Sequence, residues 1–497
     1  MIMTDVLRQY ATSQPDKVCT TYNGREWSYG EFYEQVRKVA GLFQTNDYQK
    51  GDIIALYSLN SDAFLVYYFG IQLAGLTVMP INTKLALPEV EYIFDHSEAK
   101  AVVYDKRLED VIVRSQYAFK EKYPICMEDG INISEDISFN EVVMNIEDTA
   151  VVMYTSGTTG KPKGVMLTHQ NIISTAAIWS EAMDMTESDR MLISTPLFHC
   201  AACHVFMIPT LYKGGTVIIE EAFSPTGTLA LLQTSNATIF FGVPAMYTIL
   251  LNMPEIKTID LPSLRLFCYG AAPMPYEMVK RLKETFPNVK VQNLYGQTEN
   301  SPAATTLKDH LALSKIGSVG EALPQTDIQV VDEFGEPLPI GQVGEIVMRG
   351  PQVMKGYLKD EEETRRAIRN GWLYSGDLGK MDEDGLLYIV DRKKDMIIRG
   401  GENVYPVEVE EVLYQIPELL EAAVVGIPHE VLGEVPKAYV VLKEGKALSK
   451  VELVAFCTER LAKYKVPDEV EFMEVLPRNA SGKVLKHTLR SPTQQVT

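Results

Sequence analysis

One short run of the chain combines the residue types that hold phosphate. Residues 154 to 164 read Tyr-Thr-Ser-Gly-Thr-Thr-Gly-Lys-Pro-Lys-Gly. Glycines let backbone N–H groups turn towards an anion, hydroxyls add donors and lysines add positive charge. An ordinary solvated turn rarely gathers all of these, so the run predicts a phosphate-binding loop. It is not a Walker loop, because Thr155 stands where that pattern needs glycine.

The elements around this loop must place it at the edge of a sheet. The apolar run 151–154 predicts a buried strand, and α/β proteins bind ligands where such strands end. Residues 28–43 repeat apolar side chains at helical spacing behind a Ser28/Glu31 capping box, and residues 52–56 and 101–104 are typical of short strands. This alternation favours an α/β fold of parallel sheets flanked by helices.

Two more polar segments fall where strands are expected to end. Tyr295, Gly296, Gln297, Thr298 and Glu299 follow the apolar run 289–291. A glutamate beside a triphosphate is a normal anchor for Mg²⁺. In the segment 373–378, Asp377 could accept hydrogen bonds from both hydroxyls of a ribose. Each segment alone is also compatible with a plain turn.

Together and in this order, these segments resemble the adenylate-forming superfamily of acyl-CoA synthetases, luciferases and peptide-synthetase adenylation domains. Residues 391–395 and 477–483 complete the resemblance, which covers nearly the whole chain. It implies an enzyme that uses ATP, Mg²⁺ and CoA. A carboxylate attacks the α-phosphorus of ATP to give acyl-adenylate and pyrophosphate, and the acyl group then passes to a thiol, giving acyl-CoA and AMP. Such a reaction depends on positioning and electrostatics.

The resemblance also implies roles for individual residues. The candidate catalytic residues are Lys483, Thr298, Glu299 and His199, with Glu299 as the metal ligand. The ATP and AMP site comprises Thr155, Ser156, Gly157, Thr158, Thr159, Gly160, Lys161, Lys163, Gly270, Ala271, Ala272, Tyr295, Gly296, Gln297, Thr298, Asp377 and Arg392. Lys394 falls at the hinge, and Gly400, Gly401 and Glu402 lie in the segment expected to line a pantetheine tunnel for CoA.

The predicted architecture has two parts. Residues 1–391 form a large AMP-binding domain whose Gly/Pro-punctuated stretch 315–353 predicts a small β-rich subdomain. Residues 392–497 form a small, mobile α+β domain that carries Lys483. We expect two strands there, at 423–425 and 438–442, and two helices, at 406–413 and 450–461.

The acid is less closely defined. The expected acyl pocket includes Cys200, Ala201, His204, Gly242 and Val243, and residues 191–219 contain no Asp or Glu that could pair with the ammonium of an amino acid. An apolar wall suits an apolar tail. The chain therefore most resembles a bacterial medium- or long-chain fatty acyl-CoA ligase. The alternatives are an aryl acid ligase of the o-succinylbenzoate or cinnamate type, an enzyme that loads a carrier protein, and a luciferase-like oxidase.

The composition and charge of the chain indicate which classes of partner to expect, namely small molecules. The 497 residues carry 47 Lys and Arg against 66 Asp and Glu, a net charge of −19, which argues against nucleic acid. Six scattered cysteines and a charged N-terminus indicate the cytoplasm, although Cys200–His204 reads C-x-x-C-H and raises the alternative of haem or zinc. The uncharged run 63–81 reads as a helix and strand, not a transmembrane segment. A homodimer and weak peripheral membrane contact stay open.

Overall fold

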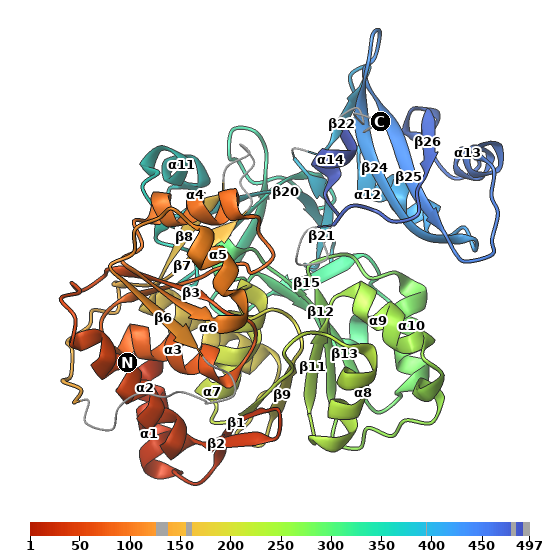
Figure 1. Ribbon diagram of the computed structural model, residues 1–497. Coiled ribbons are helices and arrows are strands. Elements are labelled where there is room, and N and C mark those ends of the chain that lie inside the picture. Colours follow the sequence, from red (N-terminus) through yellow and green to blue (C-terminus); the bar gives the residue numbers. More distant parts are fainter. Residues whose placement is uncertain (126–137, 156–161, 394, 479–483, 491–497) are drawn as a thin grey trace.

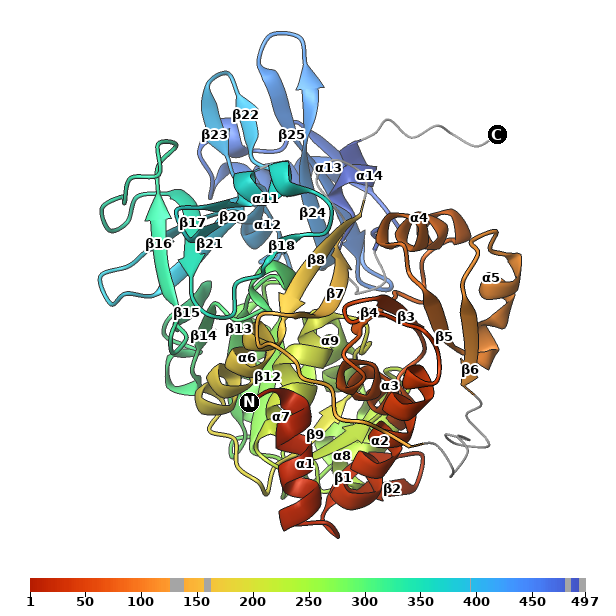
Figure 2. The same ribbon diagram turned by 90° about the vertical axis from the view of Figure 1, so that its left-hand side faces the viewer.

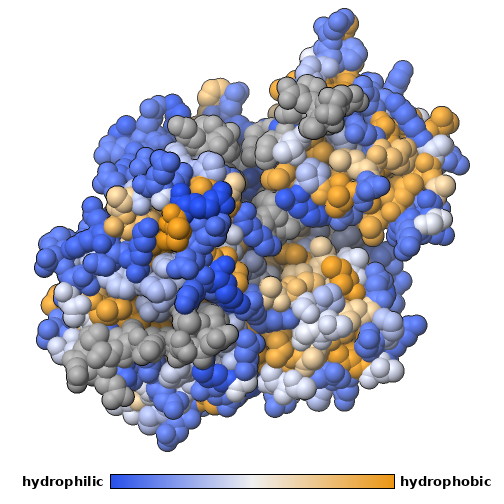
Figure 3. Space-filling view, viewed as in Figure 1, coloured by the Kyte–Doolittle hydropathy of each residue, from blue (hydrophilic) through white to orange (hydrophobic). Residues whose placement is uncertain are grey.

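The computed structural model of the protein describes residues 1–125, 138–155, 162–393, 395–478 and 484–490. Within these residues the strands form three sheets. Two of them share one core in the larger part of the molecule, and the third belongs to a separate C-terminal part at the upper right of Figure 1. Apolar side chains gather over α8–α10 and over the C-terminal sheet, on either side of the groove between the two parts (Figure 3).

The first sheet has seven strands and a mostly parallel centre. Alternate strand residues face two different clusters. Ile54, Leu56 and Val103 pack towards α2 and α3, whereas Ala55 and Val102 pack towards α4 and α5. In spatial order the strands are β18 (Gly356–Tyr357), β8 (Lys163–Thr168), β7 (Thr149–Thr155), β4 (Thr77–Pro80), β3 (Ile53–Tyr57), β5 (Ala101–Asp105) and β6 (Glu121–Ile125). The helices are α2 (Tyr29–Gln44), α3 (Asp62–Leu73), α4 (Leu87–Ser97), a 3-10 turn (Lys106–Leu108) and α5 (Glu109–Arg114).

The second sheet of the larger part has fourteen strands, which come from residues between Val18 and Arg392. Six neighbouring strands are parallel: β1 (Val18–Tyr22), β10 (Thr216–Ile219), β9 (Arg190–Ile193), β11 (Ile239–Gly242), β12 (Leu266–Gly270) and β13 (Lys290–Tyr295). The others pair antiparallel: β2 (Arg25–Ser28), β14 (Thr305–Leu307), β15 (Ser318–Ala322), β21 (Leu387–Arg392), β20 (Trp372–Met381), β17 (Gly344–Arg349), β16 (Asp327–Val331) and β19 (Ile368–Arg369).

Helices cover both faces of the parallel strands. Phe240 and Phe267 point to an outer cluster with α8–α10, and Met191 and Cys268 point to the inner core that includes residues of α6 and α7. The other helices of the larger part are α1 (Met3–Ser13), α6 (His169–Ala182), α7 (Ile208–Tyr212), α8 (Pro225–Thr234), α9 (Pro244–Asn252), α10 (Tyr276–Thr285) and α11 (Glu361–Ala367). A π-helix (Ala201–Met207) and 3-10 turns (Pro254–Lys257, Thr298–Asn300, Asp309–Leu311) complete the part.

The C-terminal part is built on its own five-stranded sheet. Val424 and Val440 pack on Val409 and Leu453 of two helices, and Val425 and Val441 pack on the opposite face with Leu489. The strands are β23 (Glu402–Val404), β22 (Ile397–Arg399), β25 (Gly433–Leu442), β24 (Leu419–His429) and β26 (Glu469–Phe472). The helices are α12 (Pro406–Leu413), α13 (Lys450–Thr458), a 3-10 turn (Lys463–Lys465) and α14 (Lys486–Arg490).

The predicted fold class is confirmed. α2 begins behind Ser28 with the expected capping box, and residues 63–81 fold as α3 and β4. No helix among the described residues is long and apolar enough to cross a membrane. The helix predicted at 450–461 ends earlier, at Thr458. A turn follows it, in which the backbone N–H groups of Arg460 and Leu461 both donate to the carbonyl oxygen of Cys457. The β-rich stretch is longer than predicted, since β20 and β21 join it to β15 in one sheet.

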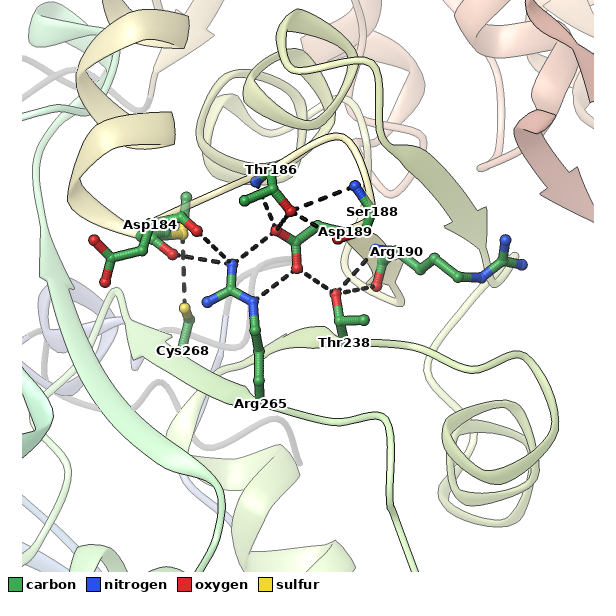
Figure 4. Close-up of polar contacts among 9 residues, drawn as sticks. Asp184, Thr186, Ser188, Asp189, Arg190, Thr238, Arg265 and Cys268 are labelled. Carbon is green, nitrogen blue, oxygen red and sulfur yellow. Dashed lines mark hydrogen bonds and ion pairs between the residues drawn. The ribbon is translucent and has the colours of Figure 1, made fainter. Parts of the chain in front are cut away.

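A charge network closes the amino ends of three parallel strands. Asp189 directly precedes β9, Thr238 precedes β11 and Arg265 precedes β12 (Figure 4). Arg265 binds the buried Asp189 through two nitrogens, at 2.7 and 2.9 Å, and the Thr238 hydroxyl donates to Asp189 at 2.7 Å. Burial alone would raise the pKa of Asp189, but the bonds from Arg265, Thr238 and the Thr186 backbone lower it. The negative charge of Asp189 is therefore matched by groups within the chain.

Candidate active site at the carboxyl ends of the strands

Three of the predicted nucleotide-binding residues meet around a fourth, Asp377. The Tyr295 hydroxyl donates to Asp377 Oδ2 at 2.6 Å, and the Gln297 side-chain amide donates to the same oxygen at 2.7 Å. Arg392 lies opposite Asp377 in the β20–β21 pairing, with its Nε 3.3 Å from Oδ1. Only 4% of Asp377 is exposed. Segments about 80 residues apart in sequence thus converge on one carboxylate.

Tyr295 is the last residue of β13, and the next residue must be glycine. A Cβ on Gly296 would lie 2.4 Å from the backbone of Pro302, so only glycine allows the two segments to come so close. Burial raises the pKa of Tyr295 well above its ordinary value, and the neighbouring Asp377 adds to the rise. The phenol therefore stays neutral and acts as a hydrogen-bond donor to Asp377.

The predicted adenine segment follows β12 directly. β12 ends at Gly270, and Ala271 has a φ of +66°, a left-handed conformation that a residue with a Cβ adopts only at a cost of about 1 kcal/mol. Ala271 and Ala272 are exposed. Strained, exposed backbone at the carboxyl end of a parallel strand is typical of a ligand site.

Glu299 lies in the 3-10 turn that follows Tyr295. Its Oε1 accepts a hydrogen bond from the Tyr357 hydroxyl at 3.0 Å. Burial raises the pKa of the Glu299 carboxyl, and hydrogen bonds and nearby cations only partly offset this effect. Thr298, beside it, is half-buried. A carboxylate that is short of positive charge is the kind of group that gains most from a bound cation.

The predicted phosphate loop connects β7 and β8. Thr155 ends β7, Lys163 begins β8, and the two residues pair in register. The Lys163 ammonium forms an ion pair with Glu363 and lies 5.2 Å from the centre of the Tyr357 ring. The other loop residues lie outside the described residues: Ser156, Gly157, Thr158, Thr159, Gly160 and Lys161. Lys394 and Lys483 also lie outside them, so their roles stay predictions.

The two segments that carry the predicted acyl-pocket residues meet through a pair of aromatic rings. The Phe206 ring of the π-helix stacks on Phe241 of β11, with ring centres 4.5 Å apart. Gly242 ends β11, and Val243 precedes α9. Ala201 is the first residue of the π-helix, a form often found at functional sites. The π-helix and β11 thus share an apolar wall at this contact.

Two histidines in this wall are neutral. Burial, together with the smaller effect of Lys84, lowers the pKa of His199 to about 4. His199 Nε2 has no hydrogen-bond partner among the described residues. Burial also lowers the pKa of His204 to about 3. Both His204 ring nitrogens are engaged, one with the Tyr68 hydroxyl at 2.8 Å and one with Cys200 Sγ at 3.4 Å. No group of three or more potential metal ligands occurs in the described part of the chain.

The predicted CoA segment forms a tight hairpin in the C-terminal part. Arg399 pairs with Glu402, and the two residues between them, Gly400 and Gly401, have φ values of +58° and +91°. A two-residue hairpin of this kind favours glycine at both positions, so the turn alone accounts for them. Glu402 is exposed. Whether this hairpin also contacts CoA stays a prediction.

The two parts meet at the predicted hinge. Asp391 of β21 accepts a hydrogen bond from the Val407 backbone, at the start of α12, at 3.2 Å. Burial raises the pKa of Asp391 to about 6, against the opposing effect of Lys486. Arg490 of α14 binds Asp395 at 2.9 Å, just beyond the hinge. Two cations of α14, Lys486 and Arg490, therefore act on carboxylates on either side of the predicted hinge.

Sequence reasoning missed two residues of this site, Tyr357 and Glu363. Tyr357 belongs to a strand of only two residues, which is too short to give a periodic pattern. Glu363 ends a run of three glutamates that is typical of the first turn of a helix. No local signal marks either residue as a neighbour of Lys163 or Glu299.

Comparison with known proteins identifies the family. The family model described as AMP-binding enzyme matches residues 7–358, and that of the AMP-binding enzyme C-terminal domain matches residues 408–483. A feruloyl-CoA synthase from Amycolatopsis sp is 36% identical over 480 residues, which cover 97% of this chain and 96% of that protein. The long-chain-fatty-acid–CoA ligase FadD13 of Mycobacterium tuberculosis is 36% identical over 497 residues, covering 98% and 97%.

Solved structures agree. The o-succinylbenzoate-CoA synthetase MenE of Bacillus subtilis, in complex with its acyl-adenylate intermediate, superposes with a TM-score of 0.89 at 32% identity, covering 98% of both chains. The same enzyme has also been solved with ATP and a magnesium ion, with a TM-score of 0.87 at 31% identity, covering 97% of this chain and 98% of that one.

The chain belongs to the AMP-binding enzyme family, and the resemblance to adenylate-forming acyl-CoA synthetases is confirmed. Within that family it is an enzyme of the acid–thiol ligase class, the AMP-forming acyl-CoA ligases. Its substrates include ATP and CoA.

Proposed function

We propose that the protein ligates a medium- or long-chain fatty acid to CoA, through an acyl-adenylate and with release of pyrophosphate and AMP. The observation that carries this choice is the apolar wall from the π-helix to β11, where Phe206 stacks on Phe241. The wall's two described histidines are uncharged, since burial lowers the pKa of each. A pocket of this character favours an apolar tail over a second charged group.

In this proposal the Asp377 cluster binds the nucleoside. Asp377 and Arg392 hold the ribose, Tyr295 stacks on the adenine, and Gly270, Ala271 and Ala272 line the base. The existing bonds from Tyr295 and Gln297 hold the Asp377 carboxylate in place before the nucleotide arrives. Such preorganisation lowers the cost of binding.

Glu299 fits a magnesium ligand. Its pKa is raised by burial, and Mg²⁺ is bound in proteins by one or two carboxylates together with phosphate oxygens. Magnesium would neutralise charge on the phosphates when bound. Thr298 would donate to the α-phosphate, His199 would lie near the substrate carboxylate, and Lys483 would bridge that carboxylate and the α-phosphate. The chain's part in the reaction is to align two anions.

The domain division at 391/392 is part of the proposal. A rotation about Lys394 would withdraw Lys483 after adenylation and bring Gly400, Gly401 and Glu402 to the site, where they would line the path of CoA. Asp391 supports this division, because it touches α12 from the other side of the predicted hinge. We also propose a cytoplasmic location; a homodimer and weak membrane contact are further hypotheses.

An aryl acid is the second candidate substrate. The feruloyl-CoA synthase and FadD13 are both 36% identical to this chain, so overall similarity favours neither class of acid. The test is acid-dependent pyrophosphate release with ATP, Mg²⁺ and CoA, across C2 to C18 fatty acids and several aryl acids.

We expect a maximum among C8 to C16 fatty acids, with turnover that depends on free CoA. Release with aryl acids alone would replace the fatty acid by the second candidate. Turnover that needs a carrier protein in place of CoA would contradict the acceptor that we propose.

A further inference from the structure

The Lys163 ammonium of β8 forms an ion pair with a carboxylate on another element. Its partner is Glu363 of α11, and both side chains are largely buried, with 13% of Lys163 and 23% of Glu363 exposed. On the other side the ammonium lies over the Tyr357 ring, whose hydroxyl binds Glu299. The described part of the site thus joins the phosphate loop to the predicted magnesium ligand through one lysine and one tyrosine.

The fold fixes Glu363 in this place. β18 pairs with β8 so that Tyr357 lies beside Val165, and α11 follows directly (Figure 2). The Asp360 side chain caps α11 by accepting from the Glu363 backbone at 2.9 Å, and the Thr364 hydroxyl binds the Tyr357 backbone at 2.8 Å. Glu363 is therefore held by its backbone and is not a chance surface contact.

We propose that Glu363 is the resting partner of Lys163, which it releases to the triphosphate and takes back when pyrophosphate leaves. This inference rests on the proposed function, in which Lys163 binds the β- and γ-phosphates. A buried ammonium without a partner is unstable, so the free enzyme needs Glu363. One ammonium cannot pair fully with two anions, so the carboxylate also competes with bound phosphate. Glu363 therefore weakens polyphosphate binding and favours product release.

The test measures affinities for Mg·ATP, pyrophosphate and AMP by calorimetry. Glu363→Gln keeps the shape of the side chain and removes its charge. It should tighten ATP and pyrophosphate binding about three- to tenfold, the range expected when one largely buried ion pair no longer competes with the phosphates. AMP binding should stay within about twofold, because AMP lacks the β- and γ-phosphates. Glu363→Asp, which keeps the charge, should lie closer to the wild type.

Two comparisons make the result specific. Glu362→Gln is the matched control: its carboxylate is 70% exposed and pairs with Arg366, so its removal should leave all three affinities unchanged. In a Lys163→Met background, Glu363→Gln should no longer tighten ATP binding, because the ammonium for which the two anions compete is absent. Thermal unfolding of each variant checks that it is folded.

Other outcomes overturn the inference. They are unchanged or weaker ATP binding by a folded Glu363→Gln, an equal effect on AMP, or an effect that persists without Lys163. A wild type that binds ATP but shows any of these results leaves the proposed function intact. A wild type that binds neither ATP nor AMP contradicts the proposed function and this inference together.

Discussion

The two edges of the long sheet hold their carboxylates in opposite ways. At the amino edge, Asp189 is bound by both arms of Arg265 and by Thr238, and its pKa is lowered (Figure 4). At the carboxyl edge, Glu299 accepts a hydrogen bond from a neutral phenol, and its pKa is raised. Both carboxylates belong to one sheet: Asp189 precedes β9 and Glu299 follows β13, with β11 and β12 between these two strands.

This difference distinguishes a carboxylate that stabilises the fold from one that is available to a ligand. At the amino edge the charge is matched within the chain, which stabilises the fold and leaves little for a ligand to gain. At the carboxyl edge the neutral Tyr357 holds Glu299 in place without cancelling its charge. Asp377 accepts hydrogen bonds from the neutral Tyr295 and Gln297 and pairs with Arg392 at 3.3 Å, a longer contact than either bond between Arg265 and Asp189. A ligand or cation can then supply what is missing.

The largest expected effect concerns Lys483, which we propose completes the carboxyl edge during adenylation. Lys483→Ala should lower the adenylation rate by about a thousandfold or more, since it removes the cation expected between the two reacting anions. It should leave thioester formation from supplied acyl-adenylate unchanged. Rapid-quench assays of each half-reaction measure both rates.

The control for this prediction is Lys446→Ala, a change of an exposed lysine in the same part. Equal loss of both half-reactions in Lys483→Ala would contradict a role confined to adenylation.

The next effect tests the carboxyl edge itself. Asp377→Asn should reduce kcat/KM for ATP about a hundredfold, because the acceptor expected for the ribose hydroxyls loses its charge. The free energy of unfolding should change by about 1 kcal/mol. Steady-state kinetics and urea unfolding give both quantities. Asp384→Asn, at the exposed turn after β20, is the control; a large stability loss with normal kinetics would make Asp377 structural.

The amino edge should respond in the reverse manner. Asp189→Asn should lower the free energy of unfolding by about 2 kcal/mol, because it leaves Arg265 without its partner. The folded fraction should keep the wild-type kcat and KM. Urea unfolding followed by fluorescence measures the stability, and active-site titration gives the folded fraction to which kcat is referred. Asp327→Asn breaks an ion pair whose side chains are 62% and 52% exposed, and should cost less than about 0.5 kcal/mol. Lost activity in folded Asp189→Asn would break the comparison.

The smallest expected effect concerns pH. Burial holds the pKa of His199 at about 4, below its ordinary value of 6.5, so the ring stays neutral from pH 7.5 down to about pH 5. His199 should therefore add no inflection near pH 6.5 to the adenylation rate. Profiles of the wild type and His199→Gln should differ in height and not in shape. An inflection near pH 6.5 in the wild type alone would show that His199 titrates during the reaction.

The sequence predicted the elements that carry strong local signals. The Ser28/Glu31 capping box marked the start of α2, and Gly75 separated α3 from β4. In the C-terminal part, β22, β23 and β26 were missed because each has only three or four residues, with charged side chains among them. Short strands are stabilised by their neighbours in the sheet, which a local pattern does not contain.

The site was predictable as a set of residues but not as a set of contacts. The resemblance named Tyr295, Gln297, Asp377 and Arg392, yet the pairing of Asp377 with Arg392 follows from the register of β20 and β21. Asp189, Thr238 and Arg265 were not predicted at all, since they lie in three separate segments of the sequence. Only the alignment of three strand ends makes them a network.

The π-helix at Ala201–Met207 has an evolutionary consequence. A π-helix arises when one extra residue is accommodated within an α-helix, and this one runs directly into α7. Deleting a single residue here would restore α-helical winding and turn the preceding side chains by about 100° around the axis. A single deletion would thus change which side chains, in place of Cys200 and His204, face the predicted acyl pocket. Changes of length in this segment offer descendants of this protein a short route to new acids, without rebuilding the strands that hold the nucleotide.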